Sequence, residues 1–142
     1  ALRMMKRISI VKEAIKAFNT GFVHAMHDTT EGGVLGGIYE MSVASKQGFI
    51  VHVKAIPIAL ETEMVCKALN VDPLKLISSG TLLLSVDPSG ANLVCNELRK
   101  IGVQVSQIGH FKKGKRIFIE KDGSEIIIKE SVIDELWKLL SG

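Results

Sequence analysis

The sequence has few aromatic residues, few cysteines and no long hydrophobic run. Only 5% of its 142 residues are aromatic, so the core must be built from Val, Ile, Leu, Met and Ala. Two cysteines are too few for a disulfide scaffold, and the spacing of Cys66 and Cys95 fits no zinc pattern. No apolar stretch approaches the ~20 residues of a membrane helix. We expect no signal peptide, because Leu2 to Arg7 is not followed by an uninterrupted apolar block. We therefore expect a cytoplasmic protein with two buried thiols and no membrane contact.

Chain length and charge limit the number of domains and the kinds of binding partner. A chain of 142 residues fits one domain over 1–142, with residues 1–8 as a tail or a leading helical turn. The densest basic run, Lys112 to Arg116, is short and has no stacking aromatic nearby except Phe111. It predicts a solvated entry to a hairpin and not a nucleic-acid site. Because the chain begins with Ala1, a fragment and a processed chain both stay open.

Hydrophobic periodicity predicts helices and strands that interleave along the chain. Helices are expected over 9–19 with Ser9 as cap, 33–46, 61–69, 91–101 and after a cap at Ser131, with a capped helical turn over 71–77. Strands are expected over 22–26, 49–53, 81–86, 103–108, 116–121 and 125–129. The run over 81–86 is apolar enough to be buried on both faces, and Asp122-Gly123 is a strong hairpin signal.

This order of elements favours an α+β fold. The economical architecture is a mixed β-sheet flanked by helices on both faces, in α/β/α layers, with a partly ferredoxin-like topology. No linker, repeat or low-complexity segment divides the chain.

The stretch from His27 to Gly37 carries the most chemistry. It links an apolar strand to a helix and holds acidic, hydroxyl and glycine residues at the crossing. Adjacent glycines at a helix start let backbone N–H groups approach an anion such as phosphate. Asp28 and Glu31 would repel that anion unless a cation lay between them, which suggests phosphate together with Mg²⁺. The alternative is a plain helix start whose glycines pack tightly on a sheet.

Three segments, in this order, resemble motifs of one family. His27-Asp28-Thr29-Thr30-Glu31-Gly32-Gly33 resembles the Asp-Pro-Thr-Arg/Glu-Gly-Gly motif that opens the C-terminal domain of the AIR synthase-related superfamily. Ser78-Ser79-Gly80-Thr81-Leu82-Leu83 resembles the small-residue loop that enters a central strand in that family. Gln107-Ile108-Gly109-His110-Phe111 resembles its Ile-Gly-Glu-hydrophobic strand end. The superfamily includes the HypE hydrogenase expression/formation proteins, thiamine-monophosphate kinase and selenophosphate synthetase.

The resemblance implies the C-terminal domain of an ATP-dependent enzyme that phosphorylates a substrate or drives a dehydration or cyclisation. Most of the ATP and Mg²⁺ site would belong to an N-terminal ATP-binding domain absent from this sequence, so the isolated domain should be inactive. That domain is the expected partner; a homodimer, the substrate and a role in hydrogenase maturation stay open. The alternative is a non-catalytic module that senses a metabolite or binds a protein on the same scaffold.

Site residues follow from the same resemblance. Asp28, with Glu31, would face Mg²⁺. Six residues would face phosphate or nucleotide: Thr30 through its hydroxyl, Gly32 and Gly33 through their amides, and Ser78, Ser79 and Gly80. For Ser78 and Ser79, the alternative is ordinary turn chemistry before the strand. His27 and His110 are the catalytic candidates, without a fixed role.

The sequence also departs from the family pattern. Thr29 replaces a common proline, which should loosen the turn, and Glu31 replaces the arginine of the hydrogenase-maturation branch. The chain ends without the reactive cysteine of HypE proteins, so it resembles a relative that cannot perform the carrier step in that way.

Overall fold

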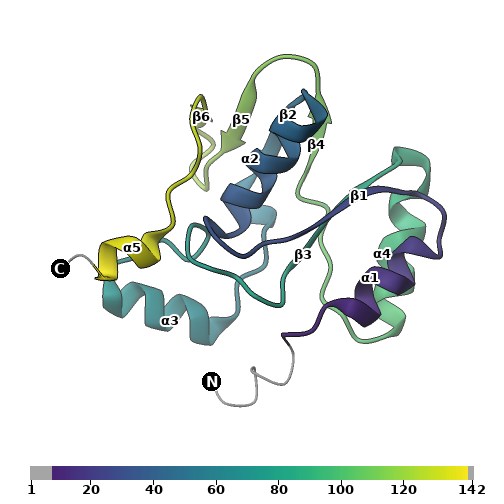
Figure 1. Ribbon diagram of the computed structural model, residues 1–142, viewed down its shortest axis with the longest axis horizontal. Coiled ribbons are helices and arrows are strands. Elements are labelled where there is room, and N and C mark those ends of the chain that lie inside the picture. Colours follow the sequence, from purple (N-terminus) through teal and green to yellow (C-terminus); the bar gives the residue numbers. More distant parts are fainter. Residues whose placement is uncertain (1–7, 141–142) are drawn as a thin grey trace.

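The computed structural model describes residues 8–140 (Figure 1). Its helices are α1 Val11–Phe18, α2 Gly33–Ser45, α3 Leu60–Leu69, α4 Ala91–Lys100 and α5 Glu135–Leu140, with short 3-10 turns η2 Val53–Ala55 and η3 Pro88–Gly90. Its strands are β1 Val23–Asp28, β2 Gly48–His52, β3 Leu82–Val86, β4 Gly109–Lys112, β5 Arg116–Ile119 and β6 Glu125–Ile127. The α+β class is confirmed. The expectation for residues 1–7 falls outside the described residues.

The strands form two sheets, where the sequence suggested a single one. β1 pairs antiparallel with β3, and the other four strands form a mixed sheet in the order β4-β2-β5-β6, in which β2 and β5 run parallel. The buried apolar residues form two clusters, and Leu83 of β3 belongs to the same cluster as the four-stranded sheet. One cluster joins α2 to the four-stranded sheet around Phe49 and Phe118, and the other packs α1 on α4 around Ala17 and Leu98. Figure 1 shows α1 and α4 side by side, apart from α2.

Glycines let α2 lie close to its neighbours. A Cβ on Gly37 would come within 2.8 Å of the Thr29 side chain and 3.0 Å of Leu83 on β3. A Cβ on Gly33, whose φ is +61°, would come within 2.5 Å of the Leu74 carbonyl oxygen. The first turns of this helix therefore pack closely, as the alternative of a plain helix start with tightly packed glycines predicts, and this packing offsets the roughly 1 kcal/mol that a glycine costs in a helix.

The strand predicted over 103–108 is wrong, because strand pairing begins only at Gly109. An alternating pattern of apolar and polar residues forms a strand only where the edge of another strand is available for pairing. Residues 103–108 instead line a cleft. The same cleft runs beside β3, so only Leu83 of that strand is buried and the expected burial on both faces is not found. The hairpin over Asp122-Gly123 is confirmed.

Of the three predicted helix caps, Asp72 forms its expected hydrogen bond, whereas Ser9 and Ser131 do not cap a helix. Ser9 does not cap α1, whose N-cap position is Ile10 without a side-chain hydrogen bond. Residues 71–77 form turns and no helix, although the Asp72 carboxylate accepts the Leu74 N–H as expected, at 3.0 Å. Ser131 does not cap the last helix; Asp134 does, by accepting the Leu136 N–H at 2.8 Å. At Asp72 and at Asp134, the carboxylate accepts a hydrogen bond from the backbone N–H two residues ahead, and this bond fixes the turn or the helix start.

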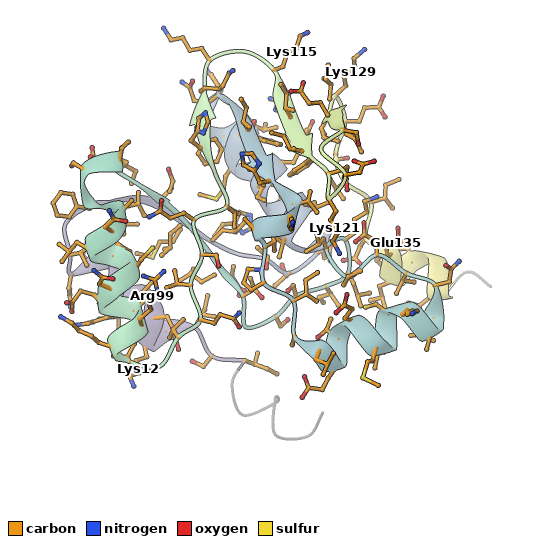
Figure 2. All side chains as sticks on the ribbon, turned by 180° about the vertical axis from the view of Figure 1, so that it is seen from behind. Lys12, Arg99, Lys115, Lys121, Lys129 and Glu135 are labelled. Atoms are coloured by element: carbon orange, nitrogen blue, oxygen red, sulfur yellow. The ribbon has the colours of Figure 1, made fainter. Side chains whose placement is uncertain are left out.

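The basic run forms the exposed connection between β4 and β5. Lys115 points outward at one end of the molecule (Figure 2). Arg116 turns inward, where its Nε donates to the Ser42 hydroxyl at 2.6 Å and its guanidinium lies 5.2 Å from the centre of the Tyr39 ring. This arginine therefore ties β5 to α2. None of the helices among residues 8–140 has the length and apolar character needed to cross a membrane.

Candidate functional site

The opening motif forms the turn between β1 and α2. Thr29 is fully buried, and its N–H donates to the Thr81 carbonyl at 3.3 Å while its hydroxyl lies 3.4 Å from the carbonyl oxygens of Ser78 and Thr81. The Ser78 N–H returns a bond to the Thr29 carbonyl at 3.2 Å. The turn is therefore tightly held, contrary to the loosening expected from Thr29, because threonine offers an N–H that proline lacks.

Gly32 occupies the N-cap position of α2 with φ +70°, in the left-handed region that glycine adopts readily. Its N–H donates to a carboxylate oxygen of Asp134 at 2.7 Å. Asp134 is only 5% exposed, and 102 residues separate it from Gly32 in the chain. The start of α2 therefore binds an anion, as its dipole favours, and that anion is the chain's own carboxylate.

The segment that carries Asp134 crosses the start of α2. A Cβ on Gly32 would come within 3.1 Å of the Val132 carbonyl oxygen, and the Glu135 N–H donates to the Lys75 carbonyl at 3.1 Å. The first turn of α2 is also joined to this region, since the Leu35 N–H donates to the Leu74 carbonyl at 3.1 Å. The C-terminal segment, the 74–75 turn and the α2 start thus form one hydrogen-bonded unit.

The two candidate metal ligands, Asp28 and Glu31, are both exposed. Among residues 8–140, no group of three or more His, Cys, Asp or Glu side chains could hold a metal ion. Mg²⁺ commonly takes one or two carboxylates and completes its shell with phosphate and water. The donor set fits such a partial site and does not fit a cage made by this domain alone. Thr30 is exposed beside them.

His27 and Glu40 form a pair at the edge of a smaller cleft. His27 Nε2 lies 2.6 Å from the Glu40 carboxylate, and Nδ1 lies 2.8 Å from the Asp28 carbonyl oxygen. A carbonyl oxygen only accepts, so Nδ1 donates to it. Both ring nitrogens are occupied, which leaves no free nitrogen for a general base in this arrangement. His27 instead fixes the end of β1, where Asp28 stands.

The second and third motifs meet in the large cleft, a space of about 1080 Å³ between the two sheets. Ser78, Ser79, Gly80 and His110 all line it, as does Val34 from the first turn of α2. The Ser78 hydroxyl bonds the Thr81 hydroxyl at 2.9 Å, and Gly80 has φ +92° in the turn between them. His27 lies in the other cleft. Asp28, Thr30, Glu31, Gly32 and Gly33 line neither of these clefts. The predicted site residues therefore divide between the β1–α2 turn and the large cleft, and Thr29 joins the two through its hydrogen bonds to the carbonyls of Ser78 and Thr81.

The two cysteines are free and buried, as expected. Burial raises the pKa of the Cys66 thiol, and the nearby Asp72 carboxylate raises it further. A thiol with a raised pKa is a poor nucleophile, so Cys66 is structural.

Sequence and structure comparisons identify the family and the fold of this chain. Residues 1–122 match the sequence model of the AIR synthase related protein, C-terminal domain. The chain belongs to this family. It is 30% identical over 100 residues to the carbamoyl dehydratase HypE of Rhizobium leguminosarum bv. viciae, a match that covers 69% of this chain and 29% of that protein. The chain thus spans less than a third of this relative's length.

Solved structures show the same fold. Escherichia coli HypE, a hydrogenase maturation protein, has a TM-score of 0.76 at 22% identity, over 84% of this chain and 39% of that chain. HypE from a HypE–HypF complex has a TM-score of 0.76 at 19% identity, over 85% and 41% of the two chains. HypE in complex with ATP has a TM-score of 0.70 at 23% identity, over 80% and 38%.

Sequence reasoning missed Asp134 and Glu40. Asp134 directly precedes the last helix, where an aspartate is a common cap, but nothing in the sequence connects it with Gly32. Glu40 lies 13 residues after His27, a spacing that no local pattern marks.

Proposed function

We propose that this domain contributes the start of α2 to the phosphate and Mg²⁺ site of an ATP-dependent enzyme, at an interface with an N-terminal ATP-binding domain. The observation that carries the proposal is the 2.7 Å bond from the Gly32 N–H to a carboxylate. It supports the view that this helix start has a donor and a field suited to an anion. A phosphate oxygen would take the position that Asp134 holds here.

In this proposal, the carboxylates of the motif face the metal ion that accompanies the phosphate. Asp28 and Glu31 are exposed and flank the α2 start, so they would meet a Mg²⁺ that arrives with the nucleotide. The Thr30 hydroxyl would donate a hydrogen bond to phosphate. Bound Mg²⁺ and ATP would supply an activated phosphoryl group, for phosphorylation or for activation of an oxygen. The ATP complex of a HypE protein with this fold supports ATP as the nucleotide.

The large cleft would receive the other reactant. Ser78, Ser79 and Gly80 give its wall a polar strip at the end of β3, and His110 adds a titratable side chain. Thr29 links this strip to the phosphate side through hydrogen bonds to the carbonyls of Ser78 and Thr81. The substrate would thus lie near the phosphate without touching the His27–Glu40 pair.

The test is ATP turnover by the full-length protein with Mg²⁺. Asp28→Ala should lower kcat/KM by on the order of 100-fold, because a metal-facing charge is lost at the transferring phosphate. Glu130→Ala, the loss of an exposed carboxylate outside the motif, serves as control and should leave turnover unchanged. Unchanged turnover and nucleotide affinity in Asp28→Ala would refute the role of Asp28 and favour a non-catalytic sensing or interaction module. The 142-residue chain alone should not hydrolyse ATP.

A further inference from the structure

Glu13, in the first turn of α1, has a buried carboxylate oxygen that makes no hydrogen bond. Its Oε2 has no partner among residues 8–140. In a capping box, the acidic residue at the third helical position bonds back to the N–H of the N-cap residue, which is Ile10 here, but Oε2 makes no such bond. A buried acceptor without a donor is costly, because it has lost its water and gained no hydrogen bond. This oxygen is therefore open to a donor that a ligand brings.

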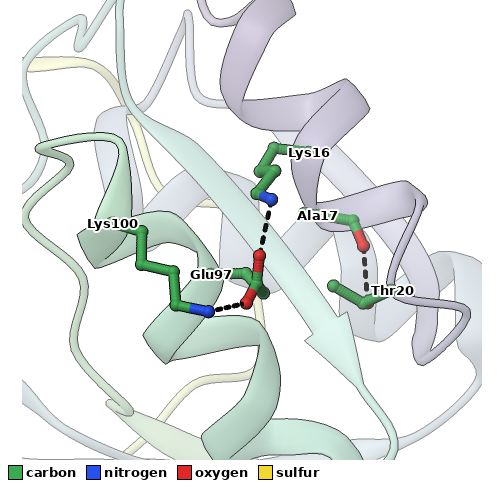
Figure 3. Close-up of polar contacts among 5 residues, drawn as sticks. All are labelled: Lys16, Ala17, Thr20, Glu97 and Lys100. Carbon is green, nitrogen blue, oxygen red and sulfur yellow. Dashed lines mark hydrogen bonds and ion pairs between the residues drawn. The ribbon is translucent and has the colours of Figure 1, made fainter.

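The lysine that follows Glu13 by one turn is paired with another carboxylate. Lys16 lies 2.5 Å from one oxygen of Glu97 on α4, and Lys100 lies 2.5 Å from the other oxygen (Figure 3). The hydrogen bond from Lys100, and then that from Lys16, lower the pKa of Glu97 to about 2. Lys12, the other lysine of α1, is exposed. Within the described part of the chain, two cations thus share Glu97, and none is bonded to Oε2 of Glu13.

Glu13 is the one Asp, Glu, Lys or Arg among the described residues that line the large cleft. The 142 residues carry a net charge of +3, so a single negative charge in the cleft does not simply follow from composition. Hydrophobic residues form most of the wall, including those of β3. Opposite charges attract more strongly beside such a wall than in bulk water. The cleft therefore favours a ligand that carries a positive charge.

The size of the cleft and the single free oxygen limit the kind of cation. A volume of about 1080 Å³ is close to the upper end of the range typical of small-molecule sites, which have apolar walls and a few polar groups that fix the orientation of the ligand. A guanidinium group is planar and pairs with both oxygens of a carboxylate, whereas an ammonium group is compact and can donate to one oxygen. Oε2 of Glu13 is one such oxygen. A protonated amine is therefore the cation that fits.

We infer that Glu13 binds the protonated amine of a small-molecule substrate in the large cleft. The ammonium group would donate to Oε2, and the uncharged polar end of the same molecule would meet Ser78 and Ser79, which line this cleft. This inference rests on the proposed function, because it names the class of reactant that the cleft receives. Glu13 would select and position the substrate without touching the phosphate. Its loss should therefore raise KM for that substrate and change kcat little.

Two probes of similar size test the inference in the full-length protein at about pH 7, where alkyl amines are protonated. Benzylamine carries an ammonium group, and benzyl alcohol carries an uncharged hydroxyl on the same ring. We expect a Kd at least about tenfold lower for benzylamine in ligand-observed NMR, because a hydrogen bond between charged groups is stronger than one between neutral groups. Glu13→Gln keeps the size of the side chain and should abolish this preference. The matched control is Glu63→Gln, which changes an exposed acid in the first turn of α3 and should preserve it.

Equal Kd values for the two probes, or a preference that survives Glu13→Gln, would overturn the inference. A benzylamine affinity that rises about tenfold when Lys6→Gln and Arg7→Gln are combined would also overturn it, because basic residues of the chain itself would then compete for Glu13. The phosphate site is tested separately. A benzylamine preference together with full ATP turnover in Asp28→Ala would refute only the phosphate site. Loss of turnover in Asp28→Ala without a benzylamine preference would refute only the amine site.

Discussion

Replacing Asp134 should destabilise the domain more than any exposed aspartate does. Its carboxylate accepts the Gly32 N–H at 2.7 Å and the Leu136 N–H at 2.8 Å, and the side chain is buried. A hydrogen bond to a charged group contributes about 2 kcal/mol, and a helix cap about 1 kcal/mol. Asp134→Ala should therefore cost about 3 kcal/mol. Asp134→Asn retains one oxygen, which can serve one of the two donors, and should cost about half as much.

The assay is urea unfolding of the chain followed by circular dichroism. With an m value on the order of 2 kcal/mol/M, the midpoint of Asp134→Ala should fall by about 1.5 M. The matched control is Asp122→Ala, since the exposed Asp122 accepts the Ser124 N–H at 2.9 Å in a hairpin turn. Its midpoint should move by less than about 0.3 M. Equal shifts for Asp134→Ala and Asp122→Ala would refute the claim that Asp134 joins the C-terminal segment to α2.

Three further outcomes follow from the packing and the charges. Gly37→Ala should lower stability by about 1–3 kcal/mol in thermal unfolding, because its Cβ would come within 3.0 Å of Leu83; an unchanged melting temperature would contradict that packing. Glu97, with its pKa lowered to about 2, stabilises the fold above pH 4.5 and loses that contribution as the pH falls toward 2. Acid unfolding should therefore be less steep in Glu97→Gln between these pH values, and identical profiles would count against the ion pairs. Cys66, 1% exposed, should react with a thiol reagent only as fast as the protein unfolds; rapid labelling of the folded chain would show that the thiol is accessible.

Local chemistry made much of the fold predictable. The helix over Gly33–Ser45 follows from apolar periodicity, and the hairpin between β5 and β6 follows from Asp122-Gly123. The segment over 103–108 alternates like a strand, yet it faces a cleft and not a strand edge, which its own residues cannot reveal. Whether a segment pairs in a sheet depends on which strands lie beside it, so the absence of pairing over 103–108 was not predictable from the sequence.

The candidate site was predictable only in part. The resemblance assigns residues of the first and second motifs to the same phosphate or nucleotide, and the hydrogen bonds from the Thr29 hydroxyl to the carbonyls of Ser78 and Thr81 join these two segments. The anion at the α2 start could not be predicted, because Asp134 lies 102 residues from Gly32 and its position depends on the fold of the whole domain. Long-range contacts of this kind leave no periodic trace in a sequence.

The central claim is that nucleotide phosphate replaces the Asp134 carboxylate on the Gly32 N–H. Glu31-Gly32 is the only Glu-Gly step in these 142 residues, so with ¹³C′-glutamate and ¹⁵N-glycine the Gly32 amide is the only one of them bonded to a ¹³C′ carbonyl, and a carbonyl-filtered NMR experiment selects it. The measurement is the chemical shift of this amide in the full-length protein, before and after a non-hydrolysable ATP analogue with Mg²⁺. We expect the Gly32 amide resonance to lie at a new chemical shift when the nucleotide is saturating. In Asp134→Asn, the saturated protein should give the same chemical shift. A Gly32 resonance that does not move at saturating nucleotide would contradict the claim.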